Sequence, residues 1–392
     1  MSIELTQRNA TMADLVTGLE AQQLQKLDAV IPAQAIRSVG GTLVVAGMGL
    51  DGPVGEPGLF QPTAIMDGQI AARLGIPSEY LKRLRVGKTE KGKTVAGPRL
   101  DIYDANVNAW LHGDQMPMSD GAGPDGRSFL LRSFTDQDGG VGVGRALLSD
   151  RFGVIDNLDM TAAVFQGIRD TGIDVEVQGC DVSETRMTVK IVAPSIQIMA
   201  EKLLEGYRSP FSGKEGKDMP VVFAGLVFTN SETGGGAYQV IPRFVVEICS
   251  NGMTMKRDAL REVHIGSKLE EGVIRWTRET HQQNLELVAA KTRDAVATFL
   301  DEDYMTMVVD RLTEKAATPI TDPAKAVELI GSQLRYTEEQ RAGILDHFIK
   351  GGQVTAGGFM QAVTSFAQTV ADPDASFELE MSAMDALELA VA

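Results

Sequence analysis

The chain lacks the features of membrane and secreted proteins. No uninterrupted apolar run approaches about 18 residues, so we expect no membrane span. The first six residues, Met-Ser-Ile-Glu-Leu-Thr, have neither the basic start nor the apolar stretch of a signal peptide, which predicts a cytoplasmic protein. The cysteines are 2 in number, Cys180 and Cys249, and they have no partner motif. This usage excludes a disulfide framework and predicts two buried free thiols.

The sequence also lacks the short motifs of common catalytic sites. It contains no HExxH, no CxxC and no G-x-S-x-G, and its 4 histidines are scattered without the spacing of metal ligands. The acidic run at residues 301–303 lies at an expected helix boundary, where carboxylates usually complement the helix dipole. We therefore expect no metal and no cofactor, and the residues favour a noncatalytic binding protein.

The chain carries a formal net charge of -16, which argues at first against a nucleic-acid partner. The distribution changes that interpretation. Residues 1–100 carry 11 Lys+Arg against 9 Asp+Glu, whereas residues 301–392 carry 6 against 16. An acidic C-terminal region thus masks a body that is close to neutral and basic in places, so a local basic groove is compatible with the composition.

The central stretch of the sequence predicts hairpins packed with a helix. Residues 126–134 and 141–148 are apolar runs separated by a Thr-Asp-Gln-Asp-Gly-Gly turn. A helix is expected over about residues 158–169, with Asp156 or Asn157 as its N-cap. Residues 173–177 and 186–192 indicate a second strand pair. Residues 221–230 and 239–249 indicate a third, joined by a turn with three glycines that allow permissive backbone angles or face a ligand.

The flanking regions are expected to be mainly helical. On the N-terminal side, residues 12–31, 63–77 and 78–85 predict helices, 42–46 and 100–111 predict strands, and 47–62 predict a loop. On the C-terminal side, helices are expected over residues 276–300, 304–312, 323–334, 337–350, 358–370 and 375–390. The fold class is therefore α+β. Its three expected domains are a helical N-terminal one with small strands (1–100), a central hairpin domain (101–270) and an acidic helical C-terminal region (271–392).

Two groups of basic residues stand out. Residues 82–99 contain seven basic side chains against the single acid Glu90: Lys82, Arg83, Arg85, Lys88, Lys91, Lys93 and Arg99. Residues 87–94 also match the phosphate-loop pattern G-x-x-x-x-G-K-[ST], but the context is neither a preceding apolar strand nor a following helix. We interpret this window as a mobile basic loop. The second group is Lys256, Arg257, Arg261 and His264.

Three phrases carry a family resemblance. Residues 148–157 (Leu-Ser-Asp-Arg-Phe-Gly-Val-Ile-Asp-Asn), 230–235 (Asn-Ser-Glu-Thr-Gly-Gly) and 246–253 (Val-Glu-Ile-Cys-Ser-Asn-Gly-Met) together resemble a family of phage- and plasmid-borne proteins, domain of unknown function 932. Residues 75–80 and 358–367 look like the outer parts of that family. The resemblance implies a mobile-element origin and a bacterial host cytoplasm, and it brings no established activity.

The order of elements is also similar to that of phage single-strand annealing recombinases. This resemblance implies a ring or filament of subunits with single-stranded DNA in a basic groove beside the hairpins. The phosphate contacts that it implies are Arg145, Arg151, Arg243, Lys256, Arg257 and Arg261, with Phe152 or Tyr238 as base-stacking partners.

Our first hypothesis is a noncatalytic, oligomeric phage protein of DNA metabolism that binds or anneals single-stranded DNA. Its two basic groups would hold phosphates, while the acidic C-terminal region would recruit host proteins. The second hypothesis is a structural or regulatory self-assembling phage protein, with counter-defence as one role. The third is a nucleotide-dependent enzyme that uses residues 87–94.

Overall fold

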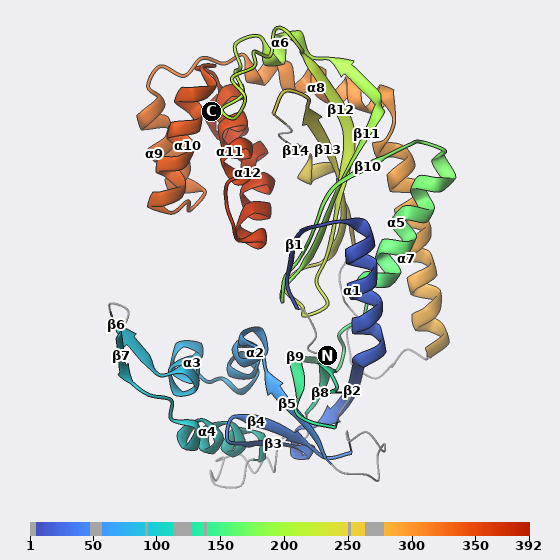
Figure 1. Cartoon of the computed structure of the whole chain (residues 1–392), viewed down its shortest axis with the longest axis vertical. Coiled ribbons are helices and arrows are strands. Elements are labelled where there is room, and N and C mark those ends of the chain that lie inside the picture. The colour runs from blue at the N-terminus through green and yellow to red at the C-terminus, as the bar shows by residue number, and fades with distance from the viewer. Residues whose placement is uncertain are drawn as a thin grey trace.

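The structure, a computed structural model, describes residues 5–47, 57–90, 93–112, 127–136, 139–249, 252–262 and 278–392. A central β-sheet occupies one half of the molecule and an N-terminal sheet the other, with helices on both (Figure 1). The α+β class expected from the sequence is confirmed, as is the largely helical character of the C-terminal region.

The central sheet is antiparallel throughout. Within the described residues it has seven strands in the order β1-β10-β11-β12-β13-β14, with β15 also paired to β13. Its strands are β1 (Gln7–Ala10), β10 (Glu176–Val182), β11 (Met187–Met199), β12 (Val221–Asn230), β13 (Tyr238–Val246), β14 (Gly252–Thr254) and β15 (Leu260–Glu262).

Helices cover both faces of this sheet, because its strands alternate apolar side chains to both sides. On one face lie α1 (Met12–Gln25), α5 (Asn157–Thr171) and α7 (Arg278–Phe299). There Phe165 of α5 meets Phe228 of β12 edge to face, with ring centroids 6.3 Å apart. On the other face α12 (Pro373–Val391) packs its Phe377 against Val227 and Ile241.

The N-terminal sheet is mixed, since β5 and β9 run parallel while its other pairs are antiparallel. Its order among the described residues is β2-β8-β9-β5-β4-β3. Helices α2, α3 and α4 pack on it. The elements are β2 (Lys26–Pro32), η1 (Ala33–Ala35), β3 (Ile36–Val39), β4 (Thr42–Val45), β5 (Gly58–Pro62), α2 (Ala64–Leu74), α3 (Ser78–Val86), α4 (Leu100–His112), β8 (Ser128–Phe134) and β9 (Gly142–Ser149).

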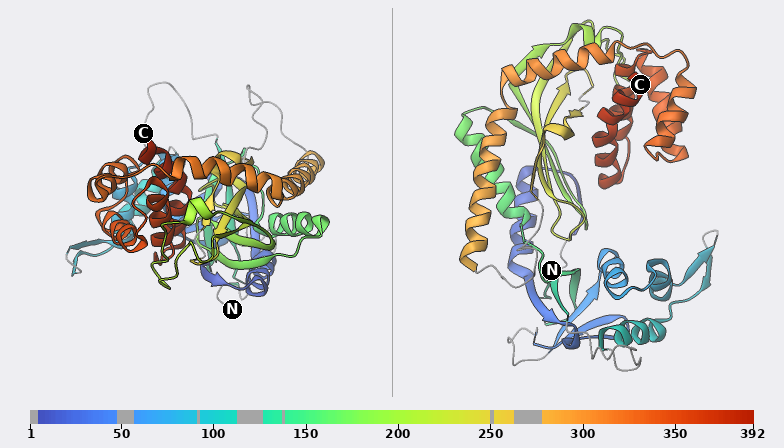
Figure 2. Two further views of the ribbon diagram at one scale, coloured as in Figure 1. Left: turned by 90° about the horizontal axis from the view of Figure 1, so that it is seen from above. Right: turned by 180° about the vertical axis from the view of Figure 1, so that it is seen from behind.

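The C-terminal helices follow one another as a bundle beside the central sheet (Figure 2). They are α8 (Glu302–Ala316), α9 (Pro323–Gln333), α10 (Glu338–Gly351), α11 (Ala356–Ala367) and α12, while the short α6 (Glu201–Leu204) and η2 (Lys256–Asp258) lie in the central region. The helix expected over residues 337–350 forms as α10 and begins with a capping box, in which Thr337 and Gln340 exchange side-chain and backbone hydrogen bonds.

Three N-terminal predictions were wrong. Residues 100–111 form the helix α4, because Tyr103, Val107 and Leu111 recur four apart and share one buried side. The first helix ends at Gln25, and the chain continues directly as β2, whose backbone groups pair with β8. Within the loop expected over residues 47–62, β5 forms between β4 and β9. In each case sheet pairing or packing overrides a weak local pattern.

The three hairpins predicted for the central stretch form, but one of them belongs to the N-terminal sheet and the bounds of another differ from the prediction. The strands β12 and β8 lie where the sequence predicted them, but the β8–β9 hairpin pairs with β2 and β5 of the N-terminal sheet. The second pair starts later than predicted, at Glu176, and β11 extends beyond the predicted end at residue 192 to Met199.

Candidate nucleic-acid interface

Most of the described part of the basic window at residues 82–99 lies on a projection that we call the arm: α3 together with the ribbon β6 (Lys88–Glu90) and β7 (Lys93–Ala96). Arg99 follows the ribbon and pairs with Asp101 at 2.8 Å. The helix α3 forms because Leu81 and Leu84 bury one side against the N-terminal core. Lys82 and Arg83 lie on its other side, exposed and without an ion-pair partner among the described residues. They are therefore free to meet an external anion.

The phosphate-loop pattern at residues 87–94 falls on an antiparallel ribbon. Gly87 ends α3 with a positive φ of 80°, and the two ribbon strands pair Thr89 with Thr94 and Glu90 with Lys93. A phosphate loop needs a strand before it and a helix N-terminus directly after it. Here a helix precedes the pattern and β7 follows it, so the nucleotide-binding context is missing. Lys91 lies outside the described residues, and only the backbone is described for Lys88 and Lys93.

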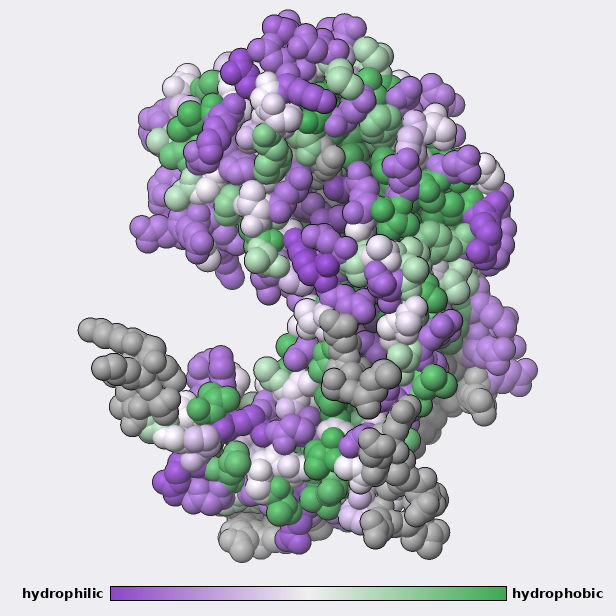
Figure 3. Space-filling view, viewed as in Figure 1, coloured by the Kyte–Doolittle hydropathy of each residue, from purple (hydrophilic) through white to green (hydrophobic). Residues whose placement is uncertain are grey.

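An open notch separates the arm from the C-terminal helices. Figure 3 shows this space on the surface of the molecule, and Figure 1 shows α2 and α3 on its lower side and the ends of α10 to α12 above. The helix α10 starts at the notch end with Glu338 and Glu339, both exposed, and finishes at the far end, where Gly351 accepts a hydrogen bond from the Arg208 amide. Exposed acids thus begin α10 above the notch, and the exposed cations Lys82 and Arg83 belong to α3 below it.

Three of the predicted phosphate contacts are occupied inside the protein. Arg85 pairs with Asp67 and stacks 4.3 Å above the Tyr103 ring. Arg145 pairs with Glu232 at 2.5 Å. These two guanidinium groups stabilise the fold through internal ion pairs and are not available to the phosphates of a DNA strand.

Arg243 is the third of these residues. It is 2% exposed between the central sheet and α12, where its side chain donates to Gln178 at 2.5 Å and lies 3.9 Å from the Glu380 carboxylate. Burial lowers the pKa of Arg243, and Glu380 opposes that shift. Tyr238, proposed for base stacking, is fully buried with its hydroxyl 3.0 Å from Thr292 Oγ1, whereas Phe152 is half-buried in a small apolar cluster.

The second basic group lies in the other half of the molecule. Lys256 and Arg257 belong to η2 beside α12, and Arg261 lies on β15; all three are exposed. Figure 1 shows β13 and β14 well separated from the arm, so the two basic groups do not form one groove. Arg151, also exposed, follows β9 in the N-terminal half, and His264 lies outside the described residues.

A buried ionic network joins the two halves at the inner end of the notch. Arg132 of β8, which is 0% exposed, donates to Asp28 of β2 at 2.9 Å and to Asp156 at 2.6 Å. It also donates to the backbone carbonyl of Glu232, in the β12–β13 turn, at 2.9 Å. Lys26 is a further partner of Asp156.

The same network replaces the N-cap that the sequence predicted. Asp156 is the N-cap residue of α5, but its carboxylate turns to Arg132 and Lys26 and makes no cap hydrogen bond. The carboxylate of Glu232 instead accepts the Asn157 amide at 2.7 Å. Burial alone would raise the pKa of Glu232, but the facing Arg145 and Arg132 guanidinium groups outweigh it and hold that pKa below its usual value.

Arg132 stays charged for a related reason. Burial alone would lower its pKa, but the carboxylates of Asp28, Glu232 and Asp156 outweigh burial and raise it. No local pattern predicts this network, because its members come from segments that are separated in the chain. Of its members, the sequence singled out Asp156 as an N-cap candidate and the Asn-Ser-Glu-Thr-Gly phrase that contains Glu232, and it singled out Arg145, the partner of Glu232, as a phosphate contact.

Neither metal-ligand clusters nor membrane-spanning helices occur among the residues that the structure describes. They contain no group of three or more His, Cys, Asp or Glu side chains that could hold a metal ion. None of their helices combines the length and the apolar composition that crossing a bilayer requires. Cys180 and Cys249 are buried free thiols, as predicted.

The fold and the arm define an α+β protein with an open notch between the arm and the C-terminal helices. Comparison of the chain with protein-family models, with curated protein sequences and with solved structures gave no match.

Proposed function

We propose that the protein is a noncatalytic binding protein of phage DNA metabolism that binds or anneals single-stranded DNA as an oligomer. The strand would cross the notch along the arm, with phosphates on Lys82, Arg83 and the lysines of the ribbon. The observation that carries the proposal is that Lys82 and Arg83 of the arm are exposed and have no ion-pair partner among the described residues.

The chemistry of a polyanion suits this arrangement. Binding of cations to phosphates releases condensed counterions, and this release supplies most of the affinity of sequence-independent binding. The window 82–99 concentrates seven basic residues against one acid. Among those whose side chains the structure describes, Arg85 is held in a buried ion pair and Arg99 in an exposed one, which leaves Lys82 and Arg83. The exposed turn at Gly234 and Gly235 offers backbone groups at the inner end of the notch, beside α2. A flexible single strand can follow such a path more readily than a stiff duplex.

A salt titration of binding to a labelled oligothymidylate tests the proposal. Each phosphate contact on a single strand contributes about 0.7 to the slope of log affinity against log salt. Replacing Lys82 and Arg83 by Gln should therefore weaken binding and reduce the slope by about 1.4. The matched control replaces Lys202 and Lys214, exposed cations at the far end of the molecule, and should leave the slope at the wild-type value. Equal slopes for wild type and the arm variant would refute the proposal.

A second candidate is a self-assembling structural or regulatory protein. The exposed acids at the start of α10 and the exposed cations of α3 favour it, because the basic arm of one copy complements the acidic helix ends of another. Such a heterologous contact builds rings or filaments. Light scattering, combined with oligonucleotide binding, decides between the two. The second function is favoured if the wild-type protein assembles, if high salt or the double variant Lys82→Glu/Arg83→Glu dissociates the assembly, and if the protein has no affinity for the oligonucleotide.

A further inference from the structure

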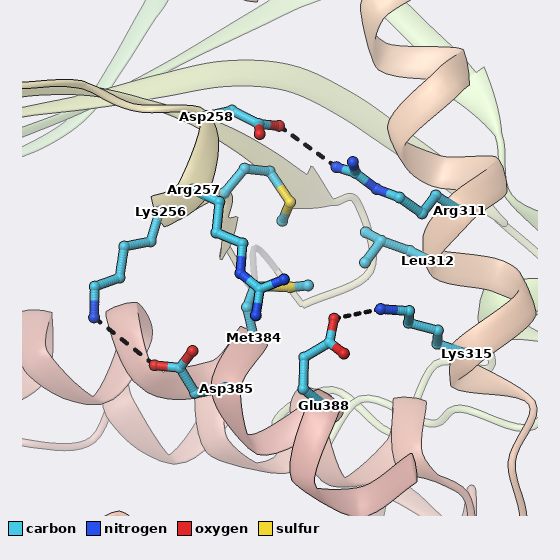
Figure 4. A pocket seen from close by; sticks show the side chains of 10 residues that line it. Lys256, Arg257, Asp258, Arg311, Leu312, Lys315, Met384, Asp385 and Glu388 are labelled. Carbon is cyan, nitrogen blue, oxygen red and sulfur yellow. Dashed lines mark hydrogen bonds and ion pairs between the residues drawn. The ribbon is translucent and has the colours of Figure 1, made fainter. Parts of the chain in front are cut away.

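A cavity of about 390 Å³ lies between η2, α8 and α12 (Figure 4). Its size falls within the range of small-molecule sites, about 300–1,000 Å³. The lining includes the apolar side chains of Met255, Leu312 and Met384, of which the first two are buried core residues. The cavity thus offers an apolar surface as well as charge.

The charged lining is almost fully paired. Lys256 lies 3.8 Å from Asp385, Arg311 lies 3.5 Å from Asp258, and Lys315 bonds to Glu388. Asp258 is held further by the Tyr304 hydroxyl at 2.8 Å. These contacts hold three of the four cations around the cavity, and they use all three of its acids.

Arg257 is the remaining cation. Figure 4 shows its side chain extending into the cavity toward Met384, between the Lys256–Asp385 pair and the Lys315–Glu388 pair. It is exposed and makes no hydrogen bond or ion pair with any residue that the structure describes. One positive charge is therefore left over in a concave, partly apolar site, which is the arrangement that receives an anion with an apolar body.

We propose that this cavity binds a small organic anion, whose phosphate or carboxylate meets Arg257 and whose apolar part lies on Met255, Leu312 and Met384. The planar guanidinium group suits both anionic groups, because each can accept two parallel hydrogen bonds. The proposal does not rest on the DNA-binding function, since the cavity and the arm lie in different halves of the molecule.

Isothermal titration calorimetry with three probes tests the site: adenosine monophosphate, octanoate and inorganic phosphate. We expect one of the two organic anions to bind in the micromolar to low millimolar range and inorganic phosphate to bind more weakly. Which organic probe binds identifies phosphate or carboxylate as the natural group. Equal affinity for inorganic phosphate would overturn the proposal, because the apolar surface would then contribute nothing.

Arg257→Gln should weaken the binding of the organic probe about 10- to 100-fold, the effect of losing a charge-assisted hydrogen bond. Arg261→Gln is the control: it removes the same charge from a nearby exposed position that does not line the cavity. Both variants should melt like wild type. Met384→Gln should weaken the binding of octanoate and change the binding of inorganic phosphate little. The idea is overturned if no probe binds, or if the two arginine variants lose equal affinity. Oligothymidylate binding by Arg257→Gln, measured alongside, separates this outcome from that of the DNA proposal.

Discussion

Arg132 is the fully buried centre of the ionic network of Lys26, Asp28, Arg132, Asp156 and Glu232 that joins the two halves, which we call the junction network. Replacing it by Met keeps an unbranched side chain about as long as the aliphatic part of arginine and removes the guanidinium. Asp28 and Asp156 would then remain close together in a largely dry site, Asp28 without its cation and Asp156 with only Lys26. The Glu232 carbonyl would lose its donor as well.

The expected loss is about 3–5 kcal/mol of unfolding free energy, the usual result of removing one partner from a buried ion pair. This is a large fraction of the roughly 5–15 kcal/mol that stabilises typical proteins. The cost arises from the acids left behind, not from the lost contact itself. The triple variant Arg132→Met/Asp28→Asn/Asp156→Asn should therefore be more stable than Arg132→Met alone.

Urea unfolding followed by circular dichroism would measure both effects. Hydrogen exchange of β8 and α5 would localise them, because a chain with two sheets need not unfold in one step. Arg151→Met, at an exposed position, is the control and should change stability by no more than about 0.5 kcal/mol. The reasoning is wrong if Arg132→Met costs less than about 1 kcal/mol, or if the triple variant is no more stable than the single one.

Three further predictions concern acid, glycine and thiol chemistry. Burial would raise the pKa of Glu232, but the facing guanidinium groups outweigh burial and hold that pKa below its ordinary value of 4.5. The ionised carboxylate therefore contributes its full stability above that pH and loses it as the pH falls. Glu232→Gln should make the melting temperature depend less on pH in the acid range. Gly343→Ala should destabilise the chain despite better helix propensity, because the new Cβ would lie 2.1 Å from the Phe366 ring, whereas Gly68→Ala, with nothing within 4 Å, should stabilise it by about 0.5–1 kcal/mol in thermal melts. Burial raises the pKa of the Cys180 thiol to about 11, so at neutral pH a thiol reagent should label it only after unfolding.

The elements that the sequence predicted well are those with a strong local signal. Residues 221–230 combine a continuous β-branched and aromatic run with a glycine-rich turn behind it, and β12 occupies that range. Thr337 and Gln340 form a capping box, and α10 begins there. Such patterns act within a few residues, so reading them requires no knowledge of the rest of the fold.

The role of a basic residue could not be read in the same way. Arg145 and Arg257 look alike in the sequence, yet one pairs with an acid 87 positions away and the other faces an open cavity. Arg243 of β13 lies close to Glu380 of the last helix, α12, and Arg85 of α3 pairs with Asp67 of α2. Whether a cation is buried depends on which distant carboxylate the folded chain brings to it, and no local spacing encodes that choice.

The residues Arg311 and Lys315 show what a further signal would have been. They lie four apart on α8, so they share one side of that helix. In the folded chain this side of α8 lines a cavity together with Lys256 and Arg257 of η2 and with residues of α12. The missing information was that η2 and α12 pack beside α8. Sheet topology supplies it, because β13 carries both β14 and β15 on one edge and so places η2 against the C-terminal helices.

The junction network also separates the shape of the notch from its charge. The chain passes between the halves twice, from α1 directly into β2 and from β9 to α5, and the β12–β13 turn binds both sides through Glu232. Arg132→Met should therefore alter the position of the arm and weaken the binding of single-stranded DNA at all salt concentrations, without changing the number of exposed cations. The Lys82 and Arg83 variants should do the reverse: they keep the position of the arm and change the salt slope. If both kinds of variant changed only the slope, the junction would have no part in orienting the arm.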